Sequence, residues 1–317
     1  MSRKKLKNRR RKDRAQRKIL IAAVCIAAVI IGVGIGGHVI KKNAGKTMTT
    51  AETESKKAVS KKKATAKKLT INENETDASN KENQGQKDQA DDRSEFAVQP
   101  GRKEGTTEQS DEKVVYLTLD DGPSKNTQAV LDILDKYNAK ATFFVTGAMP
   151  EYKDMIKKAY DKGHTIGMHT YSHDYAKVYA SVDAYFQDLD QIGQLVKEEI
   201  GYVPCFIRFP GGSSNTISAS YTKGIMTTLT QEVQARGYQY YDWNGSSGDG
   251  AVRTTEQLVD QATSFHDNNI ILLSHDSETK DTTVEALPKI IEYYQSQGYV
   301  FKALDLNSYV AHHGVNN

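Results

Sequence analysis

The chain has 317 residues and a formal net charge of +3, and this charge is distributed very unevenly. Residues 1–18 carry a net charge of +10 and residues 41–70 carry +8, whereas residues 111–317 carry −10. A nucleic-acid-binding domain normally presents a basic surface to phosphates, so the acidic C-terminal part argues against that class of function.

An apolar run over residues 19–40 follows the basic N-terminal stub and is predicted to form a transmembrane helix. A helix needs about 20 apolar residues to span a bilayer. The Lys/Arg cluster at 1–18 predicts a cytoplasmic N-terminus. A cleaved signal peptide is the alternative, but the run is long for one, and residues 38–42 offer no small-x-small cleavage site. We therefore expect a single-pass anchor in the cell membrane, with the rest of the chain outside the cell.

Residues 41–110 are rich in Lys, Glu, Thr, Ser, Asn, Gln and Asp and contain almost no large apolar side chains. Such a segment cannot bury enough apolar surface to offset the entropy lost on ordering. We expect a disordered linker that spans about 45–50 Å root-mean-square. The remaining residues, 111–317, are predicted to form one outer domain.

From Val114 onward, short apolar segments alternate with amphipathic helical patterns. The first strand is predicted over 114–119, and a face with i, i+3, i+4, i+7 spacing starts at Val130. Further helices are predicted over about 151–161, 181–199, 220–235, 254–265 and 282–296. About seven strand–helix repeats favour a parallel sheet or a βα barrel. Because about 200 residues is short for eight units, a seven-stranded or incomplete barrel fits best.

Polar side chains stand at the carboxyl ends of five predicted strands, where barrels and open α/β sheets hold their active sites. They are Asp120 and Asp121, His169 and His173, Arg208, Asp242 and Trp243, and His275. One polar residue at the end of a strand is common by chance. Five strands that end in this way predict a shared site at the mouth of the barrel.

His169 and His173 form an HxxxH pattern that can present two imidazoles to one metal ion. Alone, the pattern fits equally well two loop histidines bonded to water or backbone. With a carboxylate nearby it becomes a 2-His-1-carboxylate set with open positions, as in catalytic metal sites. Asp120 and Asp121 could cap the helix that starts near Pro123, but one Asp would be enough for capping. Two successive acids point their side chains in different directions, so one can face a metal while the other faces the substrate.

Arg208 and His275 each have a plain alternative explanation. Arg208 could be a surface charge, although in a barrel mouth it should pair with a carboxylate. His275 follows a fully apolar strand and could simply cap it. The other histidines receive no role; they are His38, His164, His266, His312 and His313.

Five segments, in chain order, resemble the five motifs of the polysaccharide deacetylase family, the NodB-homology domain of carbohydrate esterase family 4. They are TLDDGP, HTYSH, RFPGGS, DWNGSSGD and LLSH. The resemblance covers about residues 113–305, and five motifs in order are far more specific than any one of them. It implies a distorted (β/α)7 barrel that hydrolyses N-acetyl groups of aminosugar polymers.

The resemblance also implies a metal site and a general base. Asp121, His169 and His173 match the metal triad. The expected cofactor is one divalent ion, Zn²⁺ first, with Co²⁺, Ni²⁺ or Mn²⁺ as alternatives. Asp120 matches the base that deprotonates water, and Arg208 matches the residue that holds this base by an ion pair. An amide needs a strong nucleophile, and Zn²⁺ lowers the pKa of water from about 15.7 to about 7.

On the substrate side, the resemblance implies a general acid and an apolar wall. His275 matches the acid that protonates the amine, which is otherwise a poor leaving group. Leu273 matches the wall for the acetyl methyl group. Pro210 and Trp243 are expected to border the substrate.

Two motifs depart from the family pattern. The third usually continues with a Tyr whose backbone N–H serves the oxyanion, and the matching residue is Gly211. Its backbone donor remains, but the aromatic side chain beside the sugar is lost. The fourth usually ends in Asp-Trp, with the Asp tuning the acidic histidine. Counting from Trp243 places Asp249 there, followed by Gly250, and Asp242 is the competing candidate.

We therefore expect a membrane-anchored, metal-dependent deacetylase at the cell wall, acting on N-acetylglucosamine of peptidoglycan and needing no obligate protein partner. The motifs do not separate N-acetylglucosamine from N-acetylmuramic acid. Deacetylation of poly-N-acetylglucosamine or chitin oligomers and acetyl-xylan esterase activity are alternatives within the enzyme class. A non-catalytic surface glycan-binding protein on the same scaffold would predict loss of a metal ligand, the base or the acid, and all are present.

Overall fold

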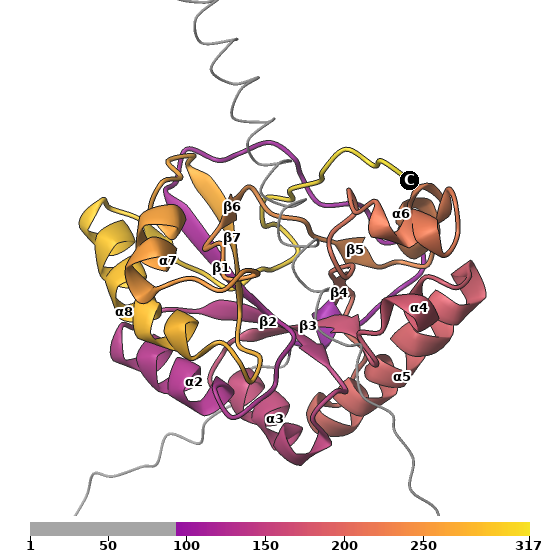
Figure 1. Ribbon diagram of the computed structural model, residues 1–317, viewed down its shortest axis with the longest axis horizontal. Coiled ribbons are helices and arrows are strands. Elements are labelled where there is room, and N and C mark those ends of the chain that lie inside the picture. The colour runs from indigo at the N-terminus through magenta and orange to yellow at the C-terminus, as the bar shows by residue number, and fades with distance from the viewer. Residues whose placement is uncertain (1–92) are drawn as a thin grey trace, which may run out of the picture. The chain divides into compact units, whose positions relative to one another are not determined.

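Eight strands form one parallel sheet in the computed structural model, which describes residues 93–317 (Figure 1). The strands are β1 (Val114–Asp120), β2 (Ala141–Thr146), β3 (Thr165–Thr170), β4 (Phe206–Ile207), β5 (Gln239–Tyr240), β6 (Gly245–Ser246), β7 (Asn269–His275) and β8 (Val300–Phe301). The order across the sheet is β5-β4-β3-β2-β1-β7-β6, and β8 pairs with the start of β1. No ladder joins β5 to β6, so this part of the chain forms a curled, open parallel sheet, consistent with the expected distorted (β/α)7 barrel.

Helices surround the curled sheet (Figure 1). They are α2 (Thr127–Lys136), α3 (Asp154–Asp161), α4 (Tyr175–Val178), α5 (Val182–Ile200), α6 (Ile225–Ala235), α7 (Thr255–Ala262) and α8 (Asp281–Ser296), with 3-10 turns η1 (Ser94–Phe96), η2 (Pro150–Tyr152) and η3 (Ile217–Ser220). Local signals explain the ends of α5: the Ser181 hydroxyl accepts a hydrogen bond from the Ala184 N–H, and Gly201 ends the helix at φ 92°. The largest difference from the predicted bounds is at α6, which starts at residue 225 because 217–220 form a 3-10 turn.

Both faces of the central strands are buried, which explains their continuous apolar sequences. On β7, Ile270 and Leu272 pack in the main core, whereas Ile271 packs in a second cluster with Phe144 and Phe206. The main cluster contains the buried faces of the helices. The two apolar layers hold β1, β2 and β7 firmly, and these strands position the polar residues at their carboxyl ends.

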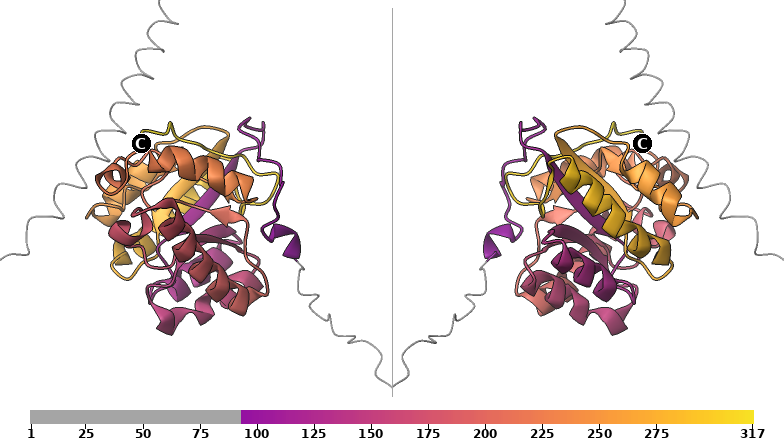
Figure 2. Two further views of the ribbon diagram at one scale, coloured as in Figure 1. Left: turned by 90° about the vertical axis from the view of Figure 1, so that its right-hand side faces the viewer. Right: turned by 90° about the vertical axis from the view of Figure 1, so that its left-hand side faces the viewer.

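Residues 93–110, predicted to end the linker, pack against the domain instead. Phe96 is buried, its ring meets Phe206 edge-on at 5.2 Å between centroids, and its carbonyl accepts a hydrogen bond from Cys205 N–H at 2.7 Å. The Arg93 guanidinium lies 3.9 Å from the centre of the Tyr160 ring. Figure 2 shows this segment running along one side of the domain. The ordered domain therefore begins before the boundary predicted near residue 110, since a few buried apolar contacts fix a mostly polar segment.

The remaining N-terminal predictions lie outside the described residues. They are the basic stub over 1–18, the transmembrane helix over 19–40 and the first part of the linker. Within residues 93–317, no helix combines the length and apolar character that a membrane crossing requires.

Candidate active site

The polar residues predicted at the strand ends come together at the carboxyl edge of the sheet. Asp120 ends β1 and lies in register with His275, which ends β7. Asp121 follows in the turn after β1, and His169 lies near the end of β3. Arg208 directly follows β4. The parallel arrangement gathers these side chains because all the strands end on the same side of the sheet.

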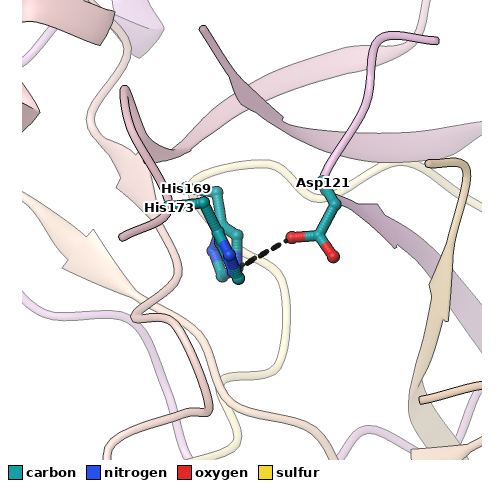
Figure 3. Close-up of side chains that lie close together, drawn as sticks. All are labelled: Asp121, His169 and His173. Atoms are coloured by element: carbon teal, nitrogen blue, oxygen red, sulfur yellow. Dashed lines mark ion pairs between the residues drawn. The ribbon is translucent and has the colours of Figure 1, made fainter. Parts of the chain in front are cut away.

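Asp121, His169 and His173 form a compact cluster whose ligand atoms all lie within 4.8 Å of one another. One carboxylate oxygen of Asp121 lies 3.5 Å from His169 Nε2 and 3.2 Å from His173 Nε2. Figure 3 shows the two imidazole rings one behind the other, facing that carboxylate; their centroids lie 5.0 Å apart. Asp121 and His173 both have positive φ, 70° and 50°, an uncommon conformation outside glycine that aims both side chains into the cluster.

The donor atoms of this cluster fit a divalent cation. His169 Nδ1 lies 2.7 Å from the carbonyl oxygen of Arg208, so Nδ1 donates and Nε2 carries the lone pair. Burial, followed by the nearby His173, lowers the pKa of His169 to about 3, which keeps the ring neutral. The Asp121 Oδ1 atom is buried and accepts no hydrogen bond within residues 93–317. A cation placed between lone pairs that face one another is stabilised by all of them, and an N₂O set suits Zn²⁺ and its transition-metal neighbours.

A buried acid on α5 holds the loop that carries His173, and sequence reasoning missed it. The Asp188 carboxylate accepts hydrogen bonds from the N–H groups of Tyr171 and Ser172 and from the Ser172 hydroxyl, at 2.5–3.2 Å. Asp188 is nearly fully buried. The available signal was an acid three residues after Tyr185, on the apolar face of a predicted helix.

Arg208 fixes the second acid, Asp120, by the ion pair that the family resemblance implied. The guanidinium is fully buried, and its Nη1 donates to Asp120 Oδ1 at 2.9 Å and to the Thr118 hydroxyl at 2.7 Å. Its remaining nitrogens donate to the carbonyl oxygens of Tyr241 and Asp242. Burial raises the pKa of Asp120 above its ordinary value, although Arg208 opposes this shift. Asp120 is therefore an oriented carboxylate that is more basic than an exposed one.

Asp249, and not Asp242, is the acid that contacts His275. Its Oδ1 lies 2.8 Å from His275 Nδ1, and its Oδ2 accepts the His275 backbone N–H at 2.8 Å and the Thr283 hydroxyl at 2.8 Å. Burial disfavours the charged imidazole, but Asp249, together with the carboxylates of Asp121 and Asp120, outweighs it and raises the pKa of His275 to about 9. His275 Nε2 lies 3.9 Å from Asp121 Oδ2, so a protonated imidazole borders the cluster of Asp121, His169 and His173.

Asp242 instead anchors the loop after β4 and the C-terminal segment. Its carboxylate accepts hydrogen bonds from Ser213 N–H at 2.8 Å and from His313 N–H at 2.7 Å. The His313 ring donates from Nε2 to the Trp243 carbonyl at 2.7 Å and meets the Trp243 ring edge-on. His313 received no role from the sequence, because no local pattern marks a contact between residues so far apart.

Four residues predicted to line the substrate side have distinct surroundings. Leu273 is buried, yet it belongs to neither apolar core cluster. Pro210 is held by the Tyr179 hydroxyl, which donates to its carbonyl at 2.7 Å. Gly211 is exposed, with φ 75°, and its N–H makes no hydrogen bond within residues 93–317. Trp243 is partly buried beside Arg208, whose guanidinium lies 5.7 Å from the ring centre.

A family model described as polysaccharide deacetylase matches residues 107–229, which include the first three motifs. The peptidoglycan-N-acetylglucosamine deacetylase of Bacillus cereus is 33% identical over 201 residues, which cover 60% of this chain and 69% of that protein. The bifunctional xylanase/deacetylase of Pseudobutyrivibrio xylanivorans is also 33% identical, but the match covers only 31% of that longer protein and 63% of this chain.

The catalytic domain of the peptidoglycan N-acetylglucosamine deacetylase from Eubacterium rectale is similar in three dimensions. It is 46% identical, with a TM-score of 0.65, and the match covers 67% of this chain and 98% of that domain. A polysaccharide deacetylase from Bacillus cereus is 31% identical with a TM-score of 0.55, over 61% of this chain and 93% of that one. The structural similarity therefore extends over nearly the whole of both known domains.

Proposed function

The chain belongs to the polysaccharide deacetylase family, and from this premise we propose that it hydrolyses N-acetyl groups of an aminosugar polymer with the help of a divalent metal ion. One observation carries the proposal: a base and an acid, each held by a partner of opposite charge, flank a cluster suited to a cation. Asp120 is paired with Arg208, and His275 is paired with Asp249. Hydrolysis of an amide requires these groups because water must lose a proton and the amine must gain one.

Asp121, His169 and His173 would hold the ion, since their donor atoms already face one another. When bound, a divalent cation supplies Lewis acidity, which polarises the acetyl carbonyl and makes water nucleophilic at neutral pH. The Arg208 carbonyl orients the His169 imidazole, and Asp188 holds the loop that carries His173. Such outer contacts fix ring orientation and tune the ligands.

Asp120 accepts the proton of the attacking water as the new carbon–oxygen bond forms. Its position is fixed by Arg208, and its raised pKa suits a group that must take up a proton. His275 then donates its Nε2 proton to the amide nitrogen as the carbon–nitrogen bond breaks. The products are acetate and a free amine on the sugar. Asp249 keeps the His275 imidazole protonated and, by its contact with Nδ1, orients Nε2 toward the cluster of Asp121, His169 and His173.

Two further groups complete the proposed site. The unpaired N–H of Gly211 is available to the oxygen that becomes negatively charged during attack. Leu273 offers an apolar surface outside both core clusters, as a wall for the acetyl methyl requires. Neither contact depends on the identity of the sugar polymer.

We propose N-acetylglucosamine of peptidoglycan as the substrate. The relatives from Bacillus cereus and Eubacterium rectale are peptidoglycan N-acetylglucosamine deacetylases. The predicted anchor at 19–40 and the linker after it would place the domain outside the membrane and within reach of the cell wall. A cell-wall polysaccharide is therefore the expected partner.

The test is to incubate the full-length protein in detergent with purified peptidoglycan and to analyse the released muropeptides by mass spectrometry. Three conditions are needed: as purified, with chelator, and with chelator followed by excess Zn²⁺. We expect loss of one acetyl group from glucosamine units, suppression by chelator and recovery with Zn²⁺. Chitin oligomers and acetylated xylan are run in parallel. Activity on either of these with none on peptidoglycan would reassign the substrate, and no activity on any of them would contradict the deacetylase proposal.

A further inference from the structure

In the turn after β4, Gly211 has no side chain, and the hydroxyl of Tyr175 from α4 lies in the space where its Cβ would be. A Cβ atom built on Gly211 would lie 2.7 Å from the hydroxyl oxygen of Tyr175. This is closer than real Cβ contacts come. The hydroxyl of Tyr175 therefore occupies the space that a side chain at position 211 would enter.

Tyr175 is placed there by the segment that also carries a metal-site histidine. It begins α4, only two residues after His173, and the Asp174 carboxylate caps this short helix by accepting the Ala176 N–H. The Tyr175 ring meets the His173 ring edge-on, at 5.8 Å between centroids, and the Tyr179 ring at 5.4 Å. Two aromatic contacts fix the ring, so the position of its hydroxyl is set in advance.

The hydroxyl of Tyr175 has no hydrogen-bond partner within residues 93–317, and the side chain is only partly buried. Its neighbour Tyr179 differs, because the Tyr179 hydroxyl donates to the Pro210 carbonyl at 2.7 Å. Tyr179 thus supports the turn, whereas Tyr175 leaves a donor free beside the exposed Gly211.

We propose that Tyr175 is a substrate-binding residue that contacts the sugar carrying the acetyl group, in place of a side chain at position 211. The inference rests on the proposed function, because it assigns the contact to an aminosugar substrate. A tyrosine offers an apolar ring and one polar tip, which matches a sugar with apolar ring hydrogens and hydroxyl groups. Since Tyr175 touches a metal-site histidine on one side and Gly211 on the other, it lies beside the position of the reacting acetyl group.

The experiment compares Tyr175→Phe and Tyr175→Leu with the wild type in the full-length protein, using an N-acetylglucosamine oligomer and 4-nitrophenyl acetate. The first variant removes one hydrogen bond, which should raise KM for the oligomer about fivefold. The second also removes the ring and should raise KM more, about tenfold or above. We expect kcat to change little in Tyr175→Phe, because contacts made equally in ground and transition states affect KM. Hydrolysis of the small ester, which lacks the sugar, should be unchanged in this variant.

Tyr293→Phe and Tyr293→Leu are matched controls, since Tyr293 is also partly buried, packs edge-on against Tyr294, and lies on α8 away from the site. Unchanged KM in both Tyr175 variants would overturn the inference while leaving the deacetylase proposal intact. A parallel fall of oligomer and ester hydrolysis with loss of metal would also overturn it, by showing that Tyr175 only supports His173. If the wild type removes acetyl groups from neither peptidoglycan nor the N-acetylglucosamine oligomer, the deacetylase proposal itself fails, and the inference fails with it.

A double-mutant cycle tests the contact between the two residues. Gly211→Ala should lower activity in the wild-type background because its Cβ meets the Tyr175 hydroxyl. Gly211→Ala should reduce activity by a smaller factor in the Tyr175→Phe background, which has no hydroxyl at that place. The backbone strain of a non-glycine residue at φ 75° is the same in both backgrounds. Equal losses in the two backgrounds would contradict the proposed replacement of one side chain by the other.

Discussion

Two histidines on opposite sides of the site, His169 and His275, have opposite protonation states. His169, on the metal side, is buried among groups that disfavour charge, and its pKa is lowered to about 3. His275, on the acid side, is also mostly buried, yet its pKa is raised to about 9. The difference is Asp249, whose carboxylate lies 2.8 Å from His275 Nδ1. Burial alone makes an imidazole neutral, and a buried carboxylate partner reverses that effect.

Each of the two histidines also has the hydrogen-bond partner that its proposed role requires. The Nδ1 atom of His169 faces the Arg208 carbonyl, which leaves Nε2 as a lone-pair donor for a cation. Asp249 remains ionised because His275 and the Thr283 hydroxyl lower its pKa, although burial acts in the other direction. One neighbouring group therefore decides the role of each histidine: the Arg208 carbonyl for His169 and the Asp249 carboxylate for His275. Substitutions in the two groups of residues test this assignment of roles.

The largest effect is expected from removing the ligand charge on the metal side. Asp121→Asn should lose the metal and leave activity near the detection limit, because one of three ligands loses its charge. Asp120→Asn should keep the metal but lose activity by about 10²- to 10⁴-fold, the usual contribution of a general base. Metal content is measured by elemental analysis and activity by acetate release. If the two variants had equal metal content, the proposed division between the acids would be wrong.

The pKa of His275 can be changed without altering Asp121, His169 or His173. Asp249→Asn removes the charge that raises the pKa of His275, so that pKa should fall from about 9. Activity requires protonated His275, so the alkaline limb of the kcat/KM profile should move to lower pH. At neutral pH we expect a loss of about 10- to 100-fold, less than that of removing the acid itself. The control is Asp242→Asn, which should leave the position of that limb unchanged; a shift there instead would favour Asp242 as the tuning residue.

Most residues near the cluster of Asp121, His169 and His173 could be placed from the sequence because each lies at the end of a predicted strand. Strand ends in a parallel sheet converge, so the positions of Asp120, Asp121, His169 and His275 were fixed once the strands were assigned. The choice between Asp249 and Asp242 was different. Asp242 follows β5 and Asp249 follows β6, and both strands are only two residues long. The path of the loop after β6 brings Asp249 to His275 on β7.

The parts that could not be predicted depend on contacts without a local pattern. β6 is two residues long, Gly245–Ser246, and carries no apolar signal. The segment containing Phe96 has the composition of a linker, yet one buried ring and a few backbone hydrogen bonds order it. His313 contacts Asp242 and Trp243 across about 70 residues of sequence. The periodicity of apolar residues indicates which face of a helix or strand is buried. It does not reveal a single contact between residues that are far apart in the sequence.

A third histidine shows that a low pKa does not by itself make a ligand. His164 is fully buried outside the site, and burial lowers its pKa to about 3, as for His169. Its Nδ1 accepts the Ala141 N–H at 3.2 Å, and its Nε2 has no hydrogen-bond partner within residues 93–317. Among residues 93–317, no carboxylate faces it in the way that Asp121 faces His169. Its titration should therefore affect stability and not catalysis.

The smallest expected effect is that of His164→Asn, whose side-chain oxygen can still accept the Ala141 N–H. The folded-state pKa of about 3 lies below the ordinary value of 6.5, so the unfolded chain binds more protons at acid pH. The stability contributed by neutral His164 is present above pH 6.5 and is lost as the pH falls toward 3, by about 1.4 kcal/mol per pH unit. Asn cannot titrate, so urea unfolding between pH 6 and pH 4 should show a shallower loss in the variant, with activity at pH 7 unchanged. Equal slopes in the two proteins would mean that His164 is protonated in the folded state, and burial would then not suffice to explain the neutral His169 either.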